Sequence, residues 1–212
     1  MGIRCDPATR RLYVNYYMAF GWFALDEKGL PSPNRFRLVP SVGNFWDWAL
    51  ASEWHRCFAM PGGMNVSIFQ LADDGGTALT CQNIAAENRG YIAGHVPRDN
   101  IEVSTRFRKL YALRFYPERQ LMVCSLTREG RLMGQPRFFE LGPARAIRCN
   151  FKTGLLHAFA HDWVKTFALD DEGFPKEPPV MRPLSCGKLA DIIVDEATGK
   201  IYVACTLPPL EK

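Results

Sequence analysis

The chain has 212 residues, of which 47% are hydrophobic, and its 26 basic and 22 acidic side chains give a net charge of +4. This length is enough for one domain with a sizeable core. The small charge excess, with no run of five like charges, argues against binding to nucleic acid or a membrane surface.

The sequence contains neither 18 consecutive apolar residues nor the apolar core of a signal peptide. Its seven cysteines include no C-x-x-C pair, so they indicate neither a disulfide framework nor a zinc site. We therefore expect a cytoplasmic protein with reduced, mostly buried thiols, no metal and no cofactor.

Short strands separated by turn residues are predicted from the first residues onward. In the N-terminal part they cover residues 3–5, 12–16, 22–25 and 35–39. The last of them alternates polar with apolar residues, as an outer, half-solvated strand does.

This pattern is repeated along the chain. Residues 2–31 align without a gap on residues 146–175 with eleven identities in thirty positions, among them Arg4 with Arg148 and Phe23 with Phe167. The offset of 144 is three times 48, which predicts two copies in between. An L-x-x-x-G signature marks all four copies, at Leu25/Gly29, Leu71/Gly75, Leu126/Gly130 and Leu169/Gly173.

The third copy is roughly ten residues longer than the others, and we place the extra residues within 85–105. A fifth copy begins near Ile192 and stops halfway. A period of 40–50 residues with about four short strands is typical of propeller blades, whereas helical repeats show apolar spacing of 3.6 residues.

We therefore predict an all-β fold, a β-propeller-like repeat of four complete four-stranded blades plus a half blade, in a single domain spanning residues 1–212. The expected blades cover approximately residues 2–43, 44–86, 87–143 and 144–188, and the half blade covers residues 189–206.

Two segments carry a family resemblance. D-x-x-T-G-x-I-Y-V, which begins at Asp195, and L-D-D-E-G-F-P, which begins at Leu169, resemble blades of the lactonase-like β-propeller family, the 6-phosphogluconolactonase type. The resemblance implies a propeller, normally of seven blades, and an activity on lactones. Because these motifs belong to turns and strand cores, they identify blades rather than a site.

The turns of an up-and-down blade point alternately to two faces of the disc, because successive strands reverse direction. One face collects turns rich in Asp, Glu and Lys and is interpreted as solvated scaffold. The other face collects aromatic and ionisable residues, and we expect it to bind a small ligand or a partner protein. The candidate binding residues there are Tyr16, Tyr17, Trp46, Asp47, Trp48, Arg114 and Trp163. Alternatively, these aromatic side chains fill gaps between blades.

Arg4 and Arg148 occupy the same position in two blades, on first strands that are expected to line the central channel. Two such arginines could hold a carboxylate or a phosphate of a ligand. Alternatively, each of them pairs with an acid of a neighbouring blade.

His161 and Asp162, at a predicted loop tip, are candidates for general acid–base chemistry, and Glu118 is a further candidate for activating water. His157 and His161 are four residues apart, but on a strand and a turn this spacing does not place them on one face, so no metal site is predicted.

Three kinds of function remain open. The first is a non-catalytic module that binds a small molecule or a protein through the aromatic-rich face, since no nucleophile motif such as G-x-S-x-G occurs. The second, implied by the resemblance, is a hydrolase or lactonising enzyme for a small anionic sugar or organic-acid lactone. The third is a structural subunit that completes a ring with another chain, because a half blade leaves an unpaired strand edge. A homo-oligomer or a larger assembly is therefore expected.

Overall fold

The structure is a computed structural model that describes residues 2–6, 9–16, 19–39, 45–61, 65–71, 77–85, 100–114, 119–185 and 188–206. The first sheet contains β1 (Gly2–Asp6), β2 (Arg11–Tyr16), β3 (Ala19–Leu25) and β4 (Pro31–Val39). The second contains β5 (Phe45–Ala51), β6 (Arg56–Pro61), β7 (Asn65–Leu71) and β8 (Thr77–Ala85), with a 3-10 turn, η1 (Ser52–Trp54), between β5 and β6.

The third sheet contains β9 (Ile101–Ser104), β10 (Lys109–Arg114), β11 (Gln120–Leu126) and β12 (Leu132–Glu140). The fourth contains β13 (Ala146–Asn150), β14 (Leu155–Phe159), β15 (Trp163–Ala168) and β16 (Val180–Pro183). A two-stranded hairpin of β17 (Lys188–Val194) and β18 (Ile201–Thr206) follows. We call the four sheets blades 1 to 4 and the hairpin the C-terminal hairpin.

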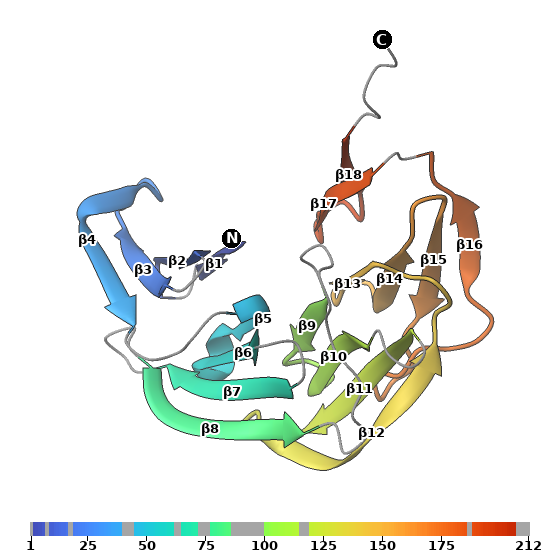
Figure 1. The fold of residues 1–212 in the computed structure, drawn as a ribbon, viewed down its shortest axis with the longest axis horizontal. Coiled ribbons are helices and arrows are strands. Elements are labelled where there is room, and N and C mark those ends of the chain that lie inside the picture. The colour runs from blue at the N-terminus through green and yellow to red at the C-terminus, as the bar shows by residue number, and fades with distance from the viewer. Residues whose placement is uncertain are drawn as a thin grey trace.

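Each blade is an antiparallel sheet whose strands follow the order of the sequence. The blades stand side by side around a centre, with their first strands innermost and their fourth strands outermost (Figure 1). This confirms the predicted propeller of four blades plus a half blade. The extra residues expected in the third copy fall mainly on residues 86–99, which lie outside the described residues.

The turn from the first to the second strand is built the same way in several blades. The Asp6 carboxylate accepts hydrogen bonds from the backbone N–H and the hydroxyl of Thr9, at 3.3 and 2.6 Å. The Asp195 carboxylate accepts the equivalent pair from Thr198 in the C-terminal hairpin. A short polar side chain that caps its own turn explains why Asp recurs where these strands end.

The last residue of this turn has a positive φ in all five copies, between 49° and 69° at Arg10, His55, Arg108, Gly154 and Gly199. Two copies use glycine, for which this conformation carries no steric cost, and three use a larger residue. Because the register on either side is equivalent, the turn geometry is imposed by the hairpin rather than chosen by the residue.

The L-x-x-x-G signature is the turn from the third to the fourth strand. The Oδ1 atoms of Asp26 and Asp170 each accept hydrogen bonds from the backbone N–H groups two and four residues later, at 2.7–3.0 Å. Gly29 and Gly173 close these turns with φ of 78° and 87°. The motif therefore reports a turn, and the copy at Gly75 lies outside the described residues.

The core lies between the blades. Blades 2 and 3 bury a cluster that includes Ala49, Phe58, Val66, Ile68, Ile101, Leu110 and Ala112. Blades 3 and 4 bury Tyr111, Leu113, Leu121, Val123, Ile147, Leu156 and Phe167 together. Smaller clusters join blade 1 to blade 2 and blade 4 to the C-terminal hairpin. Each blade is therefore stabilised mainly by its neighbours.

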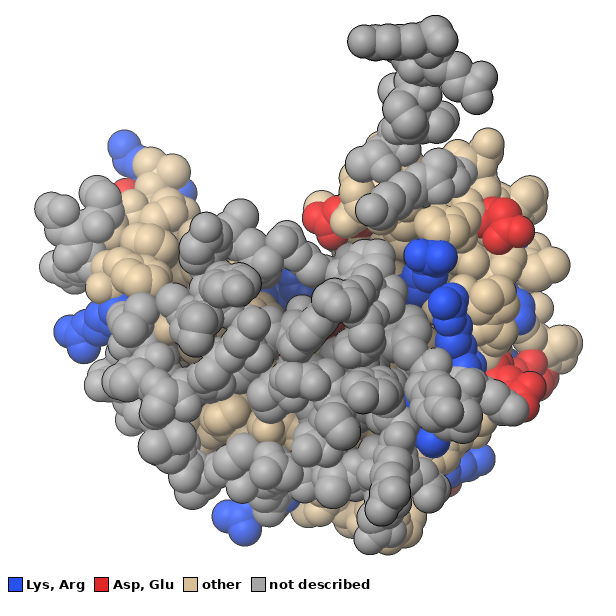
Figure 2. All heavy atoms as spheres, in the orientation of Figure 1, with Lys and Arg blue, Asp and Glu red and all other residues tan. Residues whose placement is uncertain are grey.

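The ring is open. Blade 1 and the C-terminal hairpin stand at the two ends of the array and face each other across a notch (Figures 1 and 2). Large apolar side chains are exposed at both ends, among them Ile3, Phe36, Ile193 and Tyr202.

The repeat allows one substitution to be compared at two equivalent positions. Phe167 is fully buried between blades 3 and 4, so Phe167→Ala is expected to lower the free energy of unfolding by about 3–5 kcal/mol. Phe23 lies at the open end and is only half-buried, with its ring centroid 4.8 Å from that of Phe36, so Phe23→Ala should cost about 1–2 kcal/mol. Urea unfolding of dilute, monomeric protein measures both. Equal losses of unfolding free energy would mean that the face of blade 1 that carries Phe23 is covered in solution.

Gly154→Ala is expected to cost about 1 kcal/mol from backbone strain alone, because the added Cβ would come no closer than 4.0 Å to Phe107. Gly173→Ala is the matched contrast, since its Cβ would come within 2.6 Å of the Phe107 Cβ and should cost clearly more. A Gly154→Ala protein as unstable as the Gly173→Ala protein would contradict the strain argument.

Candidate functional site

Four charged side chains from four blades meet where the first strands surround the centre. Arg4, Glu102 and Arg148 occupy the same position, two residues before the end of β1, β9 and β13. Asp47 joins them from β5, next to an irregularity in the pairing of β5 with β6. The inner strands thus bring together two cations and two acids.

Each arginine pairs with an acid of an adjacent blade. The Nη1 atom of Arg148 lies 2.8 Å from Oε1 of Glu102, and its Nε donates to the backbone oxygen of Ile192 at 3.1 Å. The Nη2 atom of Arg4 lies 3.9 Å from Oδ1 of Asp47. The Arg148 pair is short and largely buried, whereas the Arg4 side chain keeps 33% of its surface exposed. Arg4 is therefore the more accessible cation.

Asp47 holds blades 2 and 3 together through the backbone. Its buried carboxylate accepts hydrogen bonds from the N–H groups of Trp48 at 2.8 Å and Ile101 at 3.2 Å, and also from that of Asn100. Burial raises the pKa of Asp47, and the charge of Arg4 opposes this. Bonds from N–H groups favour the ionised form. Asp47 is thus a structural acceptor rather than a surface ligand group.

Glu102 is the more accessible of the two acids at this centre. Burial raises the pKa of Glu102 to about 8, although the charge of Arg4 lowers it. The short bond from Arg148 also favours the carboxylate. The side chain keeps 20% of its surface exposed, so it can exchange protons with solvent. A carboxyl group with a pKa near neutral can both accept and release a proton at working pH.

A pocket of about 170 Å³ lies against this group. Its described lining consists of Arg4, Cys5, Ala49, Leu50, Ser52, Ile101, Glu102 and Val103. We call it the axial pocket. It is smaller than most ligand sites and suits a single small ring or organic acid.

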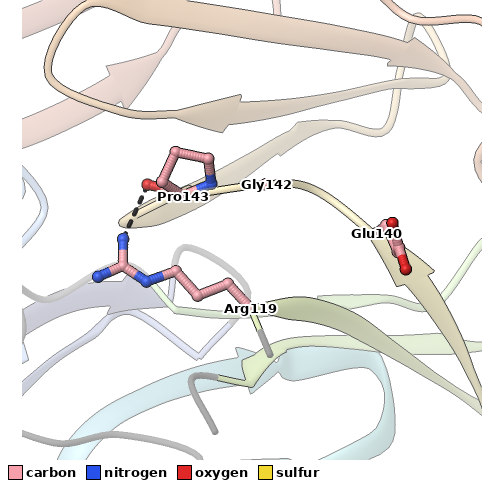
Figure 3. A pocket seen from close by; sticks show the side chains of 4 residues that line it. All are labelled: Arg119, Glu140, Gly142 and Pro143. Carbon is pink, nitrogen blue, oxygen red and sulfur yellow. Dashed lines mark hydrogen bonds between the residues drawn. The ribbon is translucent and has the colours of Figure 1, made fainter. Parts of the chain in front are cut away.

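A second pocket, of about 390 Å³, lies where blade 3 passes into blade 4 (Figure 3). Its described lining consists of Arg119, Glu140, Gly142 and Pro143. The Nη1 atom of Arg119 donates to the backbone oxygens of Pro143 at 2.8 Å and Ala144 at 3.3 Å. This pocket, here called the junction pocket, lies on the side of the ring where the connections between blades run.

Some of the aromatic-face candidates belong to the core. Trp48 is 1% exposed and packs between blades 1 and 2, so it lines no open face. Arg114 is buried, with its guanidinium carbon 5.1 Å from the centroid of the Phe138 ring. Trp163 is half-buried against the core of blades 3 and 4. Trp48 and Trp163 thus pack between blades, whereas Arg114 lies against a ring of its own blade.

His161 and Asp162 form the bend between β14 and β15. His161 is half-buried and Asp162 is exposed, and neither is among the described residues that line the two pockets. Glu118 and Tyr17 lie outside the described residues, as do the side chains of Tyr16 and Trp46.

Glu102 was missed by the sequence analysis. It is the counterpart of Arg4 and Arg148, but the longer third copy prevented an ungapped alignment. A local signal existed: Ser104 accepts a hydrogen bond from the N–H of Phe107, three residues later, as Asp6 does from Thr9. Counting back two residues from that turn gives Glu102.

The cysteines depart from expectation at one position. Cys5, Cys57, Cys124 and Cys149 are free thiols, but Cys205 on β18 is disulfide-bonded. The prediction that the thiols are reduced is therefore wrong for Cys205. In the described part of the chain no helix has the length and apolar character needed to cross a bilayer.

No family model and no curated protein matches the sequence. Solved structures do match its fold. The periplasmic gluconolactonase of Pseudomonas aeruginosa superposes with a TM-score of 0.62 at 13% identity, over 97% of this chain and 56% of that one. A gluconolactonase from Xanthomonas campestris gives 0.62 at 16% identity, over 96% and 68%. The fold is thus a β-propeller that resembles those of these two proteins.

This likeness extends beyond gluconolactonases. Hsv2 from Kluyveromyces lactis matches with a TM-score of 0.58 at 16% identity, over 95% of this chain and 56% of that one. The chain thus spans 56–68% of the length of these propellers. At such identities the likeness establishes the fold, and the chemistry must be argued from the site.

His157 provides a test of the electrostatics beside the site. It pairs with Arg148 across the β13–β14 register, and its Nδ1 lies 3.0 Å from the Thr166 hydroxyl. Burial lowers the pKa of His157 to about 4. The unfolded chain therefore binds one more proton than the folded one between about pH 4 and 6.5.

We expect the stability that His157 contributes to be lost as the pH falls from about 6.5 to about 4. His157→Gln removes the titration, so the difference in melting temperature between variant and wild type should shift in favour of the variant toward pH 4. Thermal unfolding at several pH values measures this. A difference that does not change with pH would show that His157 is not buried in its neutral form.

Proposed function

We propose that the chain binds a small anionic lactone in the axial pocket and hydrolyses it. The observation that carries this proposal is the position of Glu102 between two arginines, with a pKa near neutral and partial access to solvent. Structural likeness to two gluconolactonases supports the same reaction class. The cations explain why the substrate should be anionic.

The two arginines have different roles because their side chains differ in exposure. Arg4, the more accessible cation, binds the carboxylate or phosphate of the substrate in place of its loose pair with Asp47. Arg148 stays on Glu102 and fixes the position of that carboxyl group, because its side chain is largely buried and also bonded to the backbone of the C-terminal hairpin.

The reaction then needs one proton acceptor. Glu102 in its ionised form removes a proton from water as the water oxygen bonds to the lactone carbonyl carbon. The ring C–O bond of the resulting tetrahedral intermediate breaks, and the leaving ring oxygen takes the proton back from Glu102. The product is the open hydroxy acid, and no further reactant is consumed.

Incubation with a panel of acidic and neutral sugar lactones tests this. We expect ring opening above the buffer rate, with kcat/KM rising as the pH approaches about 8, where Glu102 ionises. Glu102→Gln should lower kcat by about 100-fold or more, because it removes the base. His161→Ala is the matched control and should leave the rate within about twofold. Undiminished activity of the Glu102→Gln protein would refute the role of Glu102.

A second candidate is a non-catalytic binding module that uses the junction pocket. It is favoured by the larger volume of this pocket and by the presence of Arg119 at its wall. Calorimetric titration with a sugar acid distinguishes the two sites. Binding that Arg119→Ala abolishes and Glu102→Gln leaves intact, without turnover of any lactone, would replace the enzymatic proposal with this one.

A further inference from the structure

The outer face of blade 1 is the face of its sheet that points away from blade 2, and none of the described residues of another blade packs on it. In blade 4 the corresponding face is fully packed against blade 3, and its members are Ile147, Cys149, Leu156, Ala158 and Phe167. The equivalent positions of blade 1 stand at the open end of the array, and they are Ile3, Cys5, Leu12, Val14 and Phe23. The Ile3 side chain, for example, is 52% exposed. Blade 1 therefore presents the same kind of surface that the propeller buries elsewhere.

The outer face of the C-terminal hairpin is the complementary surface. Ile193 and Tyr202 face each other across the β17–β18 register and are 61% and 54% exposed. Their counterparts in blade 2 are Ala49 and Phe58, a pair that is buried where blade 3 packs on blade 2. The exposed face of the hairpin thus corresponds to the face of blade 2 on which blade 3 packs.

A polar contact points in the same direction. Asp47 bonds the N–H of Trp48 through Oδ1 and reaches the start of the next blade, at Asn100 and Ile101, through Oδ2. Asp191 stands at the equivalent place in the C-terminal hairpin.

Asp191 makes only the first half of this contact. Its Oδ1 accepts from the N–H of Ile192 at 2.8 Å, the same bond that Asp47 makes to Trp48. Among the described residues, Oδ2 of Asp191 has no hydrogen-bond partner. By analogy with Asp47, this oxygen is the one that would reach the start of a further blade.

We propose that these two faces bind each other between molecules, so that blade 1 of one copy docks on the C-terminal hairpin of a second copy. The residues of β1 that correspond to Asn100 and Ile101 are Gly2 and Ile3. Their N–H groups take the position that Oδ2 of Asp191 requires, and the Ile3 side chain covers Ile193 and Tyr202. The contact reproduces between chains an interface that the chain already forms within itself.

The two faces are different, so the contact is head-to-tail. Docking at one end leaves the other end open, and assembly continues until a ring closes or a filament forms. The mass of the wild-type protein should therefore rise with concentration beyond that of a dimer.

Mixing two blocked variants tests the pairing. Ile3→Asp blocks the blade 1 face, and the double variant Ile193→Asp with Tyr202→Asp blocks the hairpin face. All three positions are exposed, so the variants should fold normally. Each variant alone is expected to sediment as a monomer. An equimolar mixture should form 1:1 dimers and nothing larger, because it contains one intact face of each kind.

Two further variants sharpen the result. Asp191→Asn should weaken association about tenfold, since it removes the charge from the contact. Met181→Asp, on the exposed outer strand β16, is the control for a change from an apolar to an acidic residue and should leave the mass unchanged. Wild-type protein that stays monomeric at high concentration, or a mixture that stays monomeric while wild type assembles, would overturn the proposal.

Discussion

A four-stranded blade has two apolar faces and cannot bury either of them by itself. Blades 2 and 3 bury both faces against their neighbours, and the largest clusters lie between blades 2 and 3 and between blades 3 and 4. The position of the charged centre follows from the same constraint. Face-to-face packing brings first strands side by side, so residues at one repeated position meet across blade boundaries.

The repeat allowed the blade architecture to be predicted from the sequence. Leu25 and Gly29, or Leu169 and Gly173, stand at fixed offsets because a hairpin of fixed register allows only one turn there. Side-chain exposure was harder to predict. Trp48 was predicted to lie in a loop, yet it lies within β5 and its side chain is buried between blades 1 and 2.

The site was predictable only in part. Arg4 and Arg148 were found because their copies are similar enough to align, and the pairing of each with an acid of an adjacent blade was one of two alternatives considered. Glu102 was hidden because it replaces an arginine with an acid in the copy of unusual length. The repeated turns and core residues belong to the scaffold, whereas Glu102 lies where one copy differs from the others. Such departures become visible only once the register is known.

The positive φ shared by five turns has a consequence for how the repeats can diverge. Arg10, His55 and Arg108 hold a left-handed conformation that glycine adopts without steric cost. A residue with a side chain is strained in this conformation. The strand pairing on both sides of the turn stabilises the conformation against that strain. Since blade 1 receives packing on one face only, its turn at Arg10 depends on fewer contacts than the turn at Arg108 does. Amide exchange, which reports local opening, should therefore be fastest at the two ends of the array and slowest in blade 3, where both faces are covered.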